Sequence, residues 1–401
     1  MKSKRLTLLL SAVAAIVIVV GGSFISAYFW GGKPEKIETV NVEILSDSHT
    51  PIQIAKQNQI PLNPVIKALG IDSVRASTVT LAELGLTPVE AKSKIEKMMV
   101  LYSEEQSKNW LKIFLKFVFW FTILIIPFVL MVKMRLTPRK RLLLVGGGVV
   151  IFGIVLGSDP SPMGTVKDAV FLLTAHKAVF IPRIIALAIF LAMVVVANKF
   201  ICSWGCQFGL LQEFMFRLNR NRKDLRGKLK QYKVPFWISN TVRIAVFIGM
   251  TAAGLLWAFD IFESIDPFKI FNPSHMIWIG IAFVAVLLLA SLFVYRPWCH
   301  FFCPFGLVSW LFEKLAIFRI KVDYNKCIAC MACSKGCPST VMDAILKKDR
   351  IVPDCFSCGT CIESCPTDAI RFSSSRKDEG DFAVGLANKR VRKERSSRSS
   401  E

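Results

Sequence analysis

Eight cysteines in the last quarter of the chain form two copies of one motif. The first copy is Cys327-x2-Cys330-x2-Cys333-x3-Cys337-Pro338, and the second is Cys355-x2-Cys358-x2-Cys361-x3-Cys365-Pro366. Three thiolates on a tight loop can bind three irons of a cubane, and the fourth cysteine reaches across to the other cubane. The spacing therefore predicts two 4Fe-4S clusters. One is held by Cys327, Cys330, Cys333 and Cys365, and the other by Cys355, Cys358, Cys361 and Cys337.

Zinc sites and disulfides are the alternatives for this pattern. Zinc ribbons use pairs of C-x2-C without a third cysteine two residues further on, and disulfides are rare in the cytoplasm. The doubled motif therefore favours iron–sulfur clusters. Clusters whose irons are all bound by cysteine leave no iron open for a substrate, so the motif predicts one-electron transfer and no catalytic residue.

The other four cysteines form a second repeated motif. Cys202-x3-Cys206 and Cys299-x3-Cys303 both belong to the pattern C-x3-C-[QP]-F-G-L. Positions i and i+4 share one face of a helix, so we expect each pair to present two thiolates to one point. A third metal or cluster site, redox-active thiols and a structural role all remain open for these four residues.

Long apolar runs must position these motifs. Hydrophobic residues make up 53% of the 401 residues and charged residues only 20%. Runs of about 20 apolar residues are long enough to cross a membrane. Six are expected, at Leu6–Trp30, Ile113–Val132, Leu142–Val155, Ile181–Ala197, Val242–Phe259 and Ile277–Val294. The predicted fold class is an α-helical integral membrane protein of about six spans with a small α+β two-cluster ferredoxin domain at the C-terminus.

The formal net charge of +22 is distributed unevenly along the chain. Lys and Arg concentrate at the N-terminus, in alternate loops and in the C-terminal tail, which orients the spans by the positive-inside rule. We expect a multi-pass protein of the prokaryotic inner membrane whose termini and ferredoxin domain face the cytoplasm. The charge is thereby explained by topology and lipid contact, and nucleic-acid binding is not expected.

The expected domain organisation follows these elements. Residues 1–30 are expected to form an N-terminal anchor, because the apolar run is longer than the core of a cleaved signal peptide, which is the alternative for this segment. An outward-facing, mostly helical domain is expected at residues 31–112, where Thr87-Pro88-Val89-Glu90 predicts a helix start. The remaining segments are a second span (113–133), a four-span core with two C-x3-C repeats (134–318), the 4Fe-4S ferredoxin-type domain (319–372) and a basic disordered tail (373–401).

Two C-x3-C motifs on a four-span core, followed by a two-cluster ferredoxin domain, resemble the NapH/NosR-type polyferredoxin membrane proteins. The resemblance covers roughly residues 141–372. It implies an electron-transfer component that relays electrons between the quinone pool and a protein redox partner, as a quinol dehydrogenase-type oxidoreductase subunit. Gln207 stands where the family has proline, which is expected to relax that turn. The outward domain is smaller than the flavin-binding domain of NosR-type proteins, and NapH-type proteins have no corresponding domain.

Two other functions require the same clusters. One is an assembly or maturation factor that reduces or delivers a metal to a partner enzyme, and the other is a redox-sensing membrane regulator. Only four histidines are present, which disfavours a haem. Charged residues in the outward loops are candidate sites for quinol protons: Asp159, Lys167, Asp168, Asp260, Glu263 and Asp266. Arg243 lies in an apolar run near its cytoplasmic end, where we expect it to snorkel.

Overall fold

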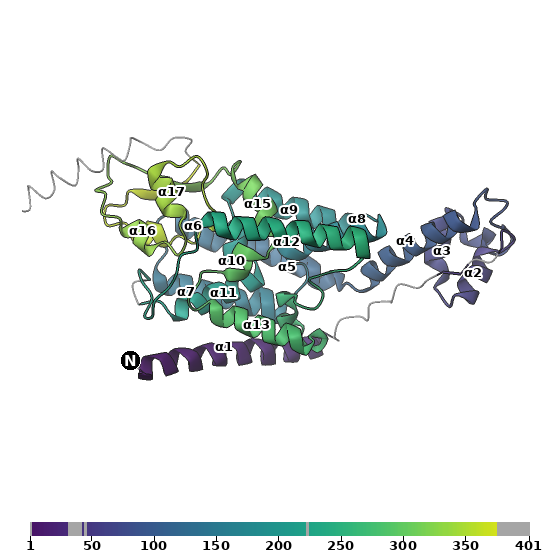
Figure 1. The fold of residues 1–401 in the computed structure, drawn as a ribbon, viewed down its shortest axis with the longest axis horizontal. Coiled ribbons are helices and arrows are strands. Elements are labelled where there is room, and N and C mark those ends of the chain that lie inside the picture. The colour runs from purple at the N-terminus through teal and green to yellow at the C-terminus, as the bar shows by residue number, and fades with distance from the viewer. Residues whose placement is uncertain (1, 31–41, 44–45, 222–223, 375–401) are drawn as a thin grey trace, which may run out of the picture.

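The computed structural model describes residues 2–30, 42–43, 46–221 and 224–374. The chain is mostly helical and elongated (Figure 1). Short elements near the C-terminal end, including α16 and α17, lie at one end of a helix bundle, and α2 and α3 lie at the opposite end. The predicted basic tail falls almost entirely outside the described residues.

Within the described residues, three helical stretches are long and apolar enough to cross a membrane. They are Arg5–Phe29 in α1 (Lys2–Phe29), Trp110–Val132 in α5 (Trp110–Ile123) and α6 (Ile125–Val132), and Phe236–Trp257, which is α12. Two shorter apolar helices are α9 (Ile181–Ala197) and α13 (Trp278–Ala290). The expected run Leu142–Val155 lies in α7 (Pro138–Gly148) and the π-helical η2 (Val149–Val155), which include three consecutive glycines.

Each C-x3-C motif is built in the same way. A helix ends and a five-residue helix carries the first cysteine, after which the second cysteine precedes a longer helix. In the first copy these two helices are α10 (Phe200–Trp204) and α11 (Gln207–Leu218). In the second copy they are α14 (Pro297–Phe301) and α15 (Pro304–Glu313). The repeat inferred from the sequence therefore has a matching backbone.

The segment expected to be an outward loop, residues 157–180, contains a helix of its own. It is α8 (Pro162–His176), which begins at the capping residue Ser161 and packs against α9, α12 and α15. Its sequence mixes apolar residues with Lys167 and Asp168, so it lacks the uninterrupted apolar run used to find spans. This helix was not predicted from the sequence.

The N-terminal unit away from the ferredoxin end has a separate small core. It consists of α2 (Pro51–Gln57), α3 (Leu62–Leu69), η1 (Ser73–Ser77) and α4 (Pro88–Gln106). Ile54, Val65 and Ile95 are fully buried in that core. Thr87 caps α4 in a reciprocal capping box with Glu90, as the sequence predicted.

The cysteine-rich C-terminal part pairs its two ends in a small sheet. β1 (Arg319–Val322) lies antiparallel to β2 (Ile370–Ser373), with Arg319 opposite Ser373. Short helices lie between the two strands: α16 (Ala332–Gly336), α17 (Val341–Lys347) and α18 (Thr360–Glu363). The chain also contains the short helices η3 (Pro267–Phe271) and η4 (Pro273–His275).

This C-terminal part is joined firmly to the helix bundle. The backbone N–H of Phe318 donates to the carbonyl of Val196 at 2.9 Å, next to the start of β1. The rings of Phe128, Phe318 and Phe372 pack with centroids 5.0 to 5.8 Å apart. Aromatic pairs of this kind add to the hydrophobic stabilisation of the contact. The cysteine-rich part therefore has a fixed position against the membrane-type helices.

Candidate iron–sulfur site

The eight ferredoxin-type cysteines lie around two separate cavities. One cavity is lined by Cys327, Cys330, Cys333 and Cys365. The other is lined by Cys337, Cys355, Cys358 and Cys361. The structure thus gathers the same two groups of four that the spacing predicted, and the fourth cysteine of each motif lies at the other motif's cavity.

The backbone around the two cavities repeats the same curvature. Ala329 and Met331 have φ of 47° and 59°, and the equivalent Ser357 and Gly359 have φ of 50° and 76°. Alternation of left-handed and right-handed residues turns successive N–H groups into a concave, anion-binding nest. One such N–H, that of Ala329, donates to the Cys327 Sγ atom at 3.4 Å. The loops are therefore shaped to receive groups with anionic sulfur.

The protonation state of these thiols depends on their burial. Burial raises the pKa of Cys333 to about 12 and raises the pKa of Cys361 well above its ordinary value. Both are therefore protonated thiols at neutral pH when no metal is bound, and metal binding must release the protons. No three metal-ligating side chains among the described residues converge closely enough for a single ion.

The four C-x3-C cysteines form a second, deeper group. All four are buried, and Cys299 lies within electrostatic range of Cys202, Cys206 and Cys303. The expectation that each pair shares a helix face is wrong. α10 ends at Trp204, and Cys206 is the residue before α11. We refer to these four residues as the thiol centre.

The two turns of the thiol centre are nearly identical. Cys206 has φ −71° and ψ 113°, and Cys303 has φ −70° and ψ 115°. Gln207 therefore does not relax its turn, contrary to the prediction from its replacement of proline. Its side-chain Nε2 instead donates to the carbonyl of Ser158 at 2.5 Å, which adds a contact that proline cannot make.

The glycine of each C-x3-C-[QP]-F-G-L motif allows close packing. A Cβ atom on Gly209 would lie 2.6 Å from the carbonyl oxygen of Cys202. A Cβ atom on Gly306 would lie 2.9 Å from the carbonyl oxygen of Cys299. Because real Cβ atoms do not approach so closely, only glycine lets the longer helix of each copy fold back against its own short helix.

Two buried cations cross between the repeats. Lys199 and Arg296 each lie three residues before the first cysteine of their own motif. The Arg296 Nη1 atom donates to the carbonyl of Cys202 at 2.6 Å, and the Lys199 Nζ atom donates to the carbonyl of Gly306 at 2.9 Å. Each cation therefore stabilises the other copy of the motif. The sequence reading missed these residues, although their equal offsets were visible.

A buried carboxylate joins the bundle to the second cluster motif. Asp354 directly precedes Cys355 and forms ion pairs with Lys199 and, at 2.8 Å, with Arg243. Burial alone would raise the pKa of Asp354, but the two cations hold it at about 2, so it stays ionised. The expectation that Arg243 snorkels is wrong, because its side chain is fully buried.

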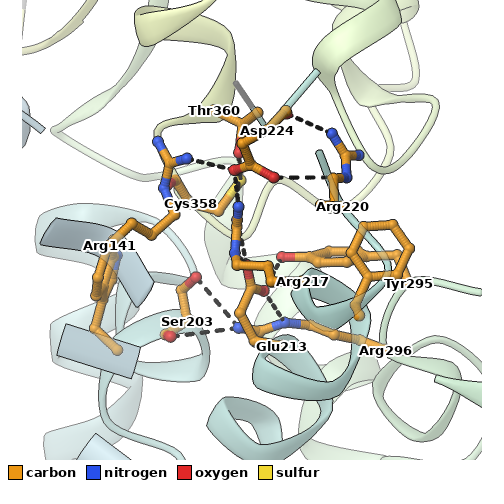
Figure 2. Close-up of polar contacts among 12 residues, drawn as sticks. Arg141, Ser203, Glu213, Arg217, Arg220, Asp224, Tyr295, Arg296, Cys358 and Thr360 are labelled. Carbon is orange, nitrogen blue, oxygen red and sulfur yellow. Dashed lines mark hydrogen bonds and ion pairs between the residues drawn. The ribbon is translucent and has the colours of Figure 1, made fainter. Parts of the chain in front are cut away.

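A second polar network connects the same two parts of the molecule (Figure 2). Glu213 on α11 accepts hydrogen bonds from Arg296 Nε at 2.8 Å and from the Tyr295 hydroxyl at 2.6 Å, and it also pairs with Arg217. Arg217 in turn reaches Asp224. Buried charges are stable only when they are paired in this way.

The network ends on the loop that carries Cys358. Arg141 pairs with Asp224 at 2.6 Å and donates from Nε to the carbonyl of Cys358 at 2.9 Å, as Figure 2 shows. Arg217 donates to the Thr360 hydroxyl at 3.3 Å. These contacts fix the second cluster loop against the bundle. The sequence did not indicate them, because the partners lie far apart along the chain.

Phe356 lies between the second cysteine cavity and the thiol centre. It lines that cavity, and its ring centroid is 5.1 Å from the guanidinium carbon of Arg296 and 5.3 Å from the ring of His300. Arg296 contacts the backbone of Cys202, and His300 follows Cys299 in the chain. Phe356 thus connects the second cavity with two residues that adjoin the thiol centre.

Two paired cysteine cavities docked on a bundle of long apolar helices define a membrane iron–sulfur protein of the electron-transfer class. Comparison with protein families agrees with this class. Residues 319–366 match a 4Fe-4S dicluster domain, and residues 179–226 and 276–324 each match a 4Fe-4S binding domain. The latter two matches each include one C-x3-C pair.

Several curated proteins are similar in sequence. YccM of Escherichia coli, whose name assigns it to electron transport, is 30% identical over 50% of this chain and 58% of its own length. The ferredoxin-type protein NapH of Haemophilus influenzae is 26% identical over 49% of this chain and 69% of its own length. The regulatory protein NosR of Pseudomonas aeruginosa is 28% identical over 40% of this chain and 22% of its own length. No solved structure matches the chain significantly.

These matches confirm the resemblance to NapH/NosR-type polyferredoxin proteins. The chain is an electron-transfer iron–sulfur protein related to NapH, YccM and NosR. The chain spans a little under six-tenths of the length of YccM.

Proposed function

We propose that this protein relays single electrons between the quinone pool and a protein redox partner. Two 4Fe-4S clusters held by the two groups of four ferredoxin-type cysteines would carry the electrons. Oxidation of one quinol gives a quinone, two protons and two electrons, and each electron reduces one cluster. The observation that carries the proposal is the contact of Phe356, which lines the second cavity, with Arg296, which donates to the carbonyl of Cys202 in the thiol centre.

The topology belongs to the same proposal. About six helical segments cross the inner membrane of a prokaryote, with both termini and the α+β ferredoxin domain in the cytoplasm. The basic loops support this orientation, as do the domain boundaries expected from the sequence. The small unit of α2, α3 and α4 then faces outward, where it is positioned to contact a partner.

The role of the thiol centre distinguishes the electron relay from the alternative function, a maturation factor. Four buried thiols that match across a repeat fit a third metal or redox site between membrane and clusters. They would also suit a maturation factor that reduces or delivers a metal to a partner enzyme.

Anaerobic reduction of the clusters by menaquinol, followed by electron paramagnetic resonance, tests the function. We expect menaquinol to reduce the wild-type clusters. In the double variant Cys202→Ser/Cys206→Ser, we expect dithionite but not menaquinol to reduce them. If menaquinol never reduces the wild-type clusters while copper is bound or reduced at the thiols, the maturation function replaces the relay. If the double variant responds to menaquinol as the wild type does, the thiol centre is not part of the electron path.

A further inference from the structure

An apolar cavity lies at the end of the bundle away from the ferredoxin-type part. It has a volume of about 250 Å³ and is bounded by α5, α9 and the segment from Asp159 to Asp168. Its body is lined by Ile113, Phe117, Ala186 and Ile189. Two further lining residues, Trp110 and Ile185, are 44% and 55% exposed on the outer surface of the bundle. The cavity therefore opens on a face that apolar side chains cover, as expected for access from lipid.

One end of this cavity is polar and tightly organised. The Arg183 Nη1 atom lies 2.9 Å from the Asp168 Oδ2 atom, and the Lys108 Nζ atom lies 3.6 Å from the Asp159 Oδ2 atom. The side chains of Arg183 and Lys108 are only 9% and 11% exposed. A mostly apolar cavity with a few converging polar groups is the usual form of a small-molecule site.

The inner wall of the cavity leads to the thiol centre. The ring of Phe117 lies 5.3 Å from the ring of Trp120 and 5.9 Å from that of Phe190. The Trp120 Nε1 atom donates to the carbonyl of Gly205 at 3.0 Å, and Gly205 is bonded to Cys206. A molecule in the cavity would thus be separated from Cys206 by two aromatic side chains.

We propose that this cavity binds the head group of a quinone whose isoprenoid tail leaves toward the lipid. The inference rests on the proposed function and locates its substrate. A quinone has a flat apolar ring, which suits Phe117, and two carbonyl oxygens that accept hydrogen bonds from Lys108 and Arg183. The two lining cations are matched by the carboxylates of Asp159 and Asp168, so this end has no excess positive charge to attract the phosphate of a lipid.

Binding of heptyl-hydroxyquinoline N-oxide, a fluorescent quinone analogue, tests the site on the full chain in detergent. In the variant Ile189→Trp the larger side chain occupies the body of the cavity. The matched control is Ile184→Trp, on the same helix, because Ile184 is 40% exposed and does not line the cavity. We expect one analogue per wild-type chain, binding weakened about tenfold or more in Ile189→Trp, and unchanged binding in Ile184→Trp.

Removal of the ion pair between Arg183 and Asp168, at the polar end of the cavity, gives a second test. Asp168→Asn removes one of the two carboxylate partners of Arg183, the other being Glu104, without changing the size of the side chain. We expect weaker binding of the analogue with the same number of bound clusters. Analogue binding that is equal in the wild type and Ile189→Trp overturns the inference, as does a phospholipid that co-purifies with the wild type and is lost from Ile189→Trp. The proposed function fails separately, when menaquinol does not reduce the clusters of the wild type.

Discussion

At the scale of single residues, the exchange of the fourth cysteine between motifs has a direct test. Cys337 lies at the cavity of the second motif, and Cys365 lies at that of the first. We expect Cys337→Ser to impair the cluster that Cys355 helps to bind and Cys365→Ser to impair the one that Cys327 helps to bind. Each variant should fall from about eight irons per chain toward about four.

Spectra of the remaining cluster distinguish the two variants. Electron paramagnetic resonance of the dithionite-reduced proteins should show a different surviving cluster in each. If the double variant Cys337→Ser/Cys327→Ser keeps one intact cluster, each motif holds its own cluster and the crossed assignment is wrong.

Among the residues that form ion pairs, Asp354 is the one whose substitution should reduce the stability of the protein most. Asp354→Asn leaves Arg243 buried without its carboxylate partner and Lys199 with only the more distant Glu313, at 3.8 Å. This should lower the free energy of unfolding by about 3–5 kcal/mol. Thermal unfolding in detergent, followed by cluster absorbance, measures the effect. Lys92→Gln is the control, because the Lys92–Glu96 pair is exposed and its loss should change stability by no more than about 0.5 kcal/mol. Equal melting of both variants would contradict the role given to Asp354.

The residues that could be predicted from the sequence are those whose chemistry depends on local spacing. The eight ferredoxin-type cysteines are grouped by intervals of two and three residues, so their cavities follow from the pattern. Asp354 could not be found in this way, since Lys199 lies 155 residues earlier. An isolated acidic residue beside a cysteine has no pattern that reveals a distant partner.

At the scale of elements, the glycines of the C-x3-C motifs control how the helices fold back. Gly209→Ala would place a Cβ atom 2.6 Å from the carbonyl of Cys202, so we expect destabilisation of about 1–3 kcal/mol and displacement of α10 from α11. Gly249→Ala in α12 is the control, because no atom lies within 4 Å of its added Cβ, and it should stabilise the helix by up to about 1 kcal/mol. Melting temperatures of the two variants in detergent compare these effects. If Gly209→Ala leaves the melting temperature unchanged, the close approach of α11 to α10 is not required for stability.

The helices themselves were predicted unevenly. The long apolar runs and the capped start of α4 were visible because hydrophobicity and capping are local properties. The break in the helix at Gly205 was not visible in the sequence. Cys202 and Cys206 were therefore expected to share one helix face. α8 was missed because its sequence is only moderately apolar, and its packing against α9, α12 and α15 is a tertiary effect.

At the scale of the whole molecule, the orientation in the membrane can be measured. A green fluorescent protein fused after Glu401 should fluoresce, and an alkaline phosphatase fused there should be inactive, because the positive-inside rule places the C-terminus in the cytoplasm. A phosphatase fused after Gln57 in α2 should be active. The opposite pattern would place the cysteine motifs in an oxidising compartment, where disulfides compete with cluster formation.

The general architecture followed from composition and motif order, but the interface between its parts did not. Hydropathy indicates membrane helices, and the doubled cysteine motif indicates a ferredoxin-type end. The docking of that end depends on Phe356, Arg296 and Glu213, which come from three separate segments. Such contacts arise only when the chain is folded, and no local pattern encodes them.

The crossed cations also bear on the order in which the bundle closes. Lys199 is synthesised 107 residues before its acceptor Gly306, and 155 residues before Asp354. Until those residues are synthesised, Lys199 has neither of these partners, and the first half of the bundle cannot make the contacts of the finished fold. We expect closure of the bundle to be delayed until the ferredoxin-type end has emerged from the ribosome, which gives the cell's cluster-loading machinery access to the cysteines before they are covered.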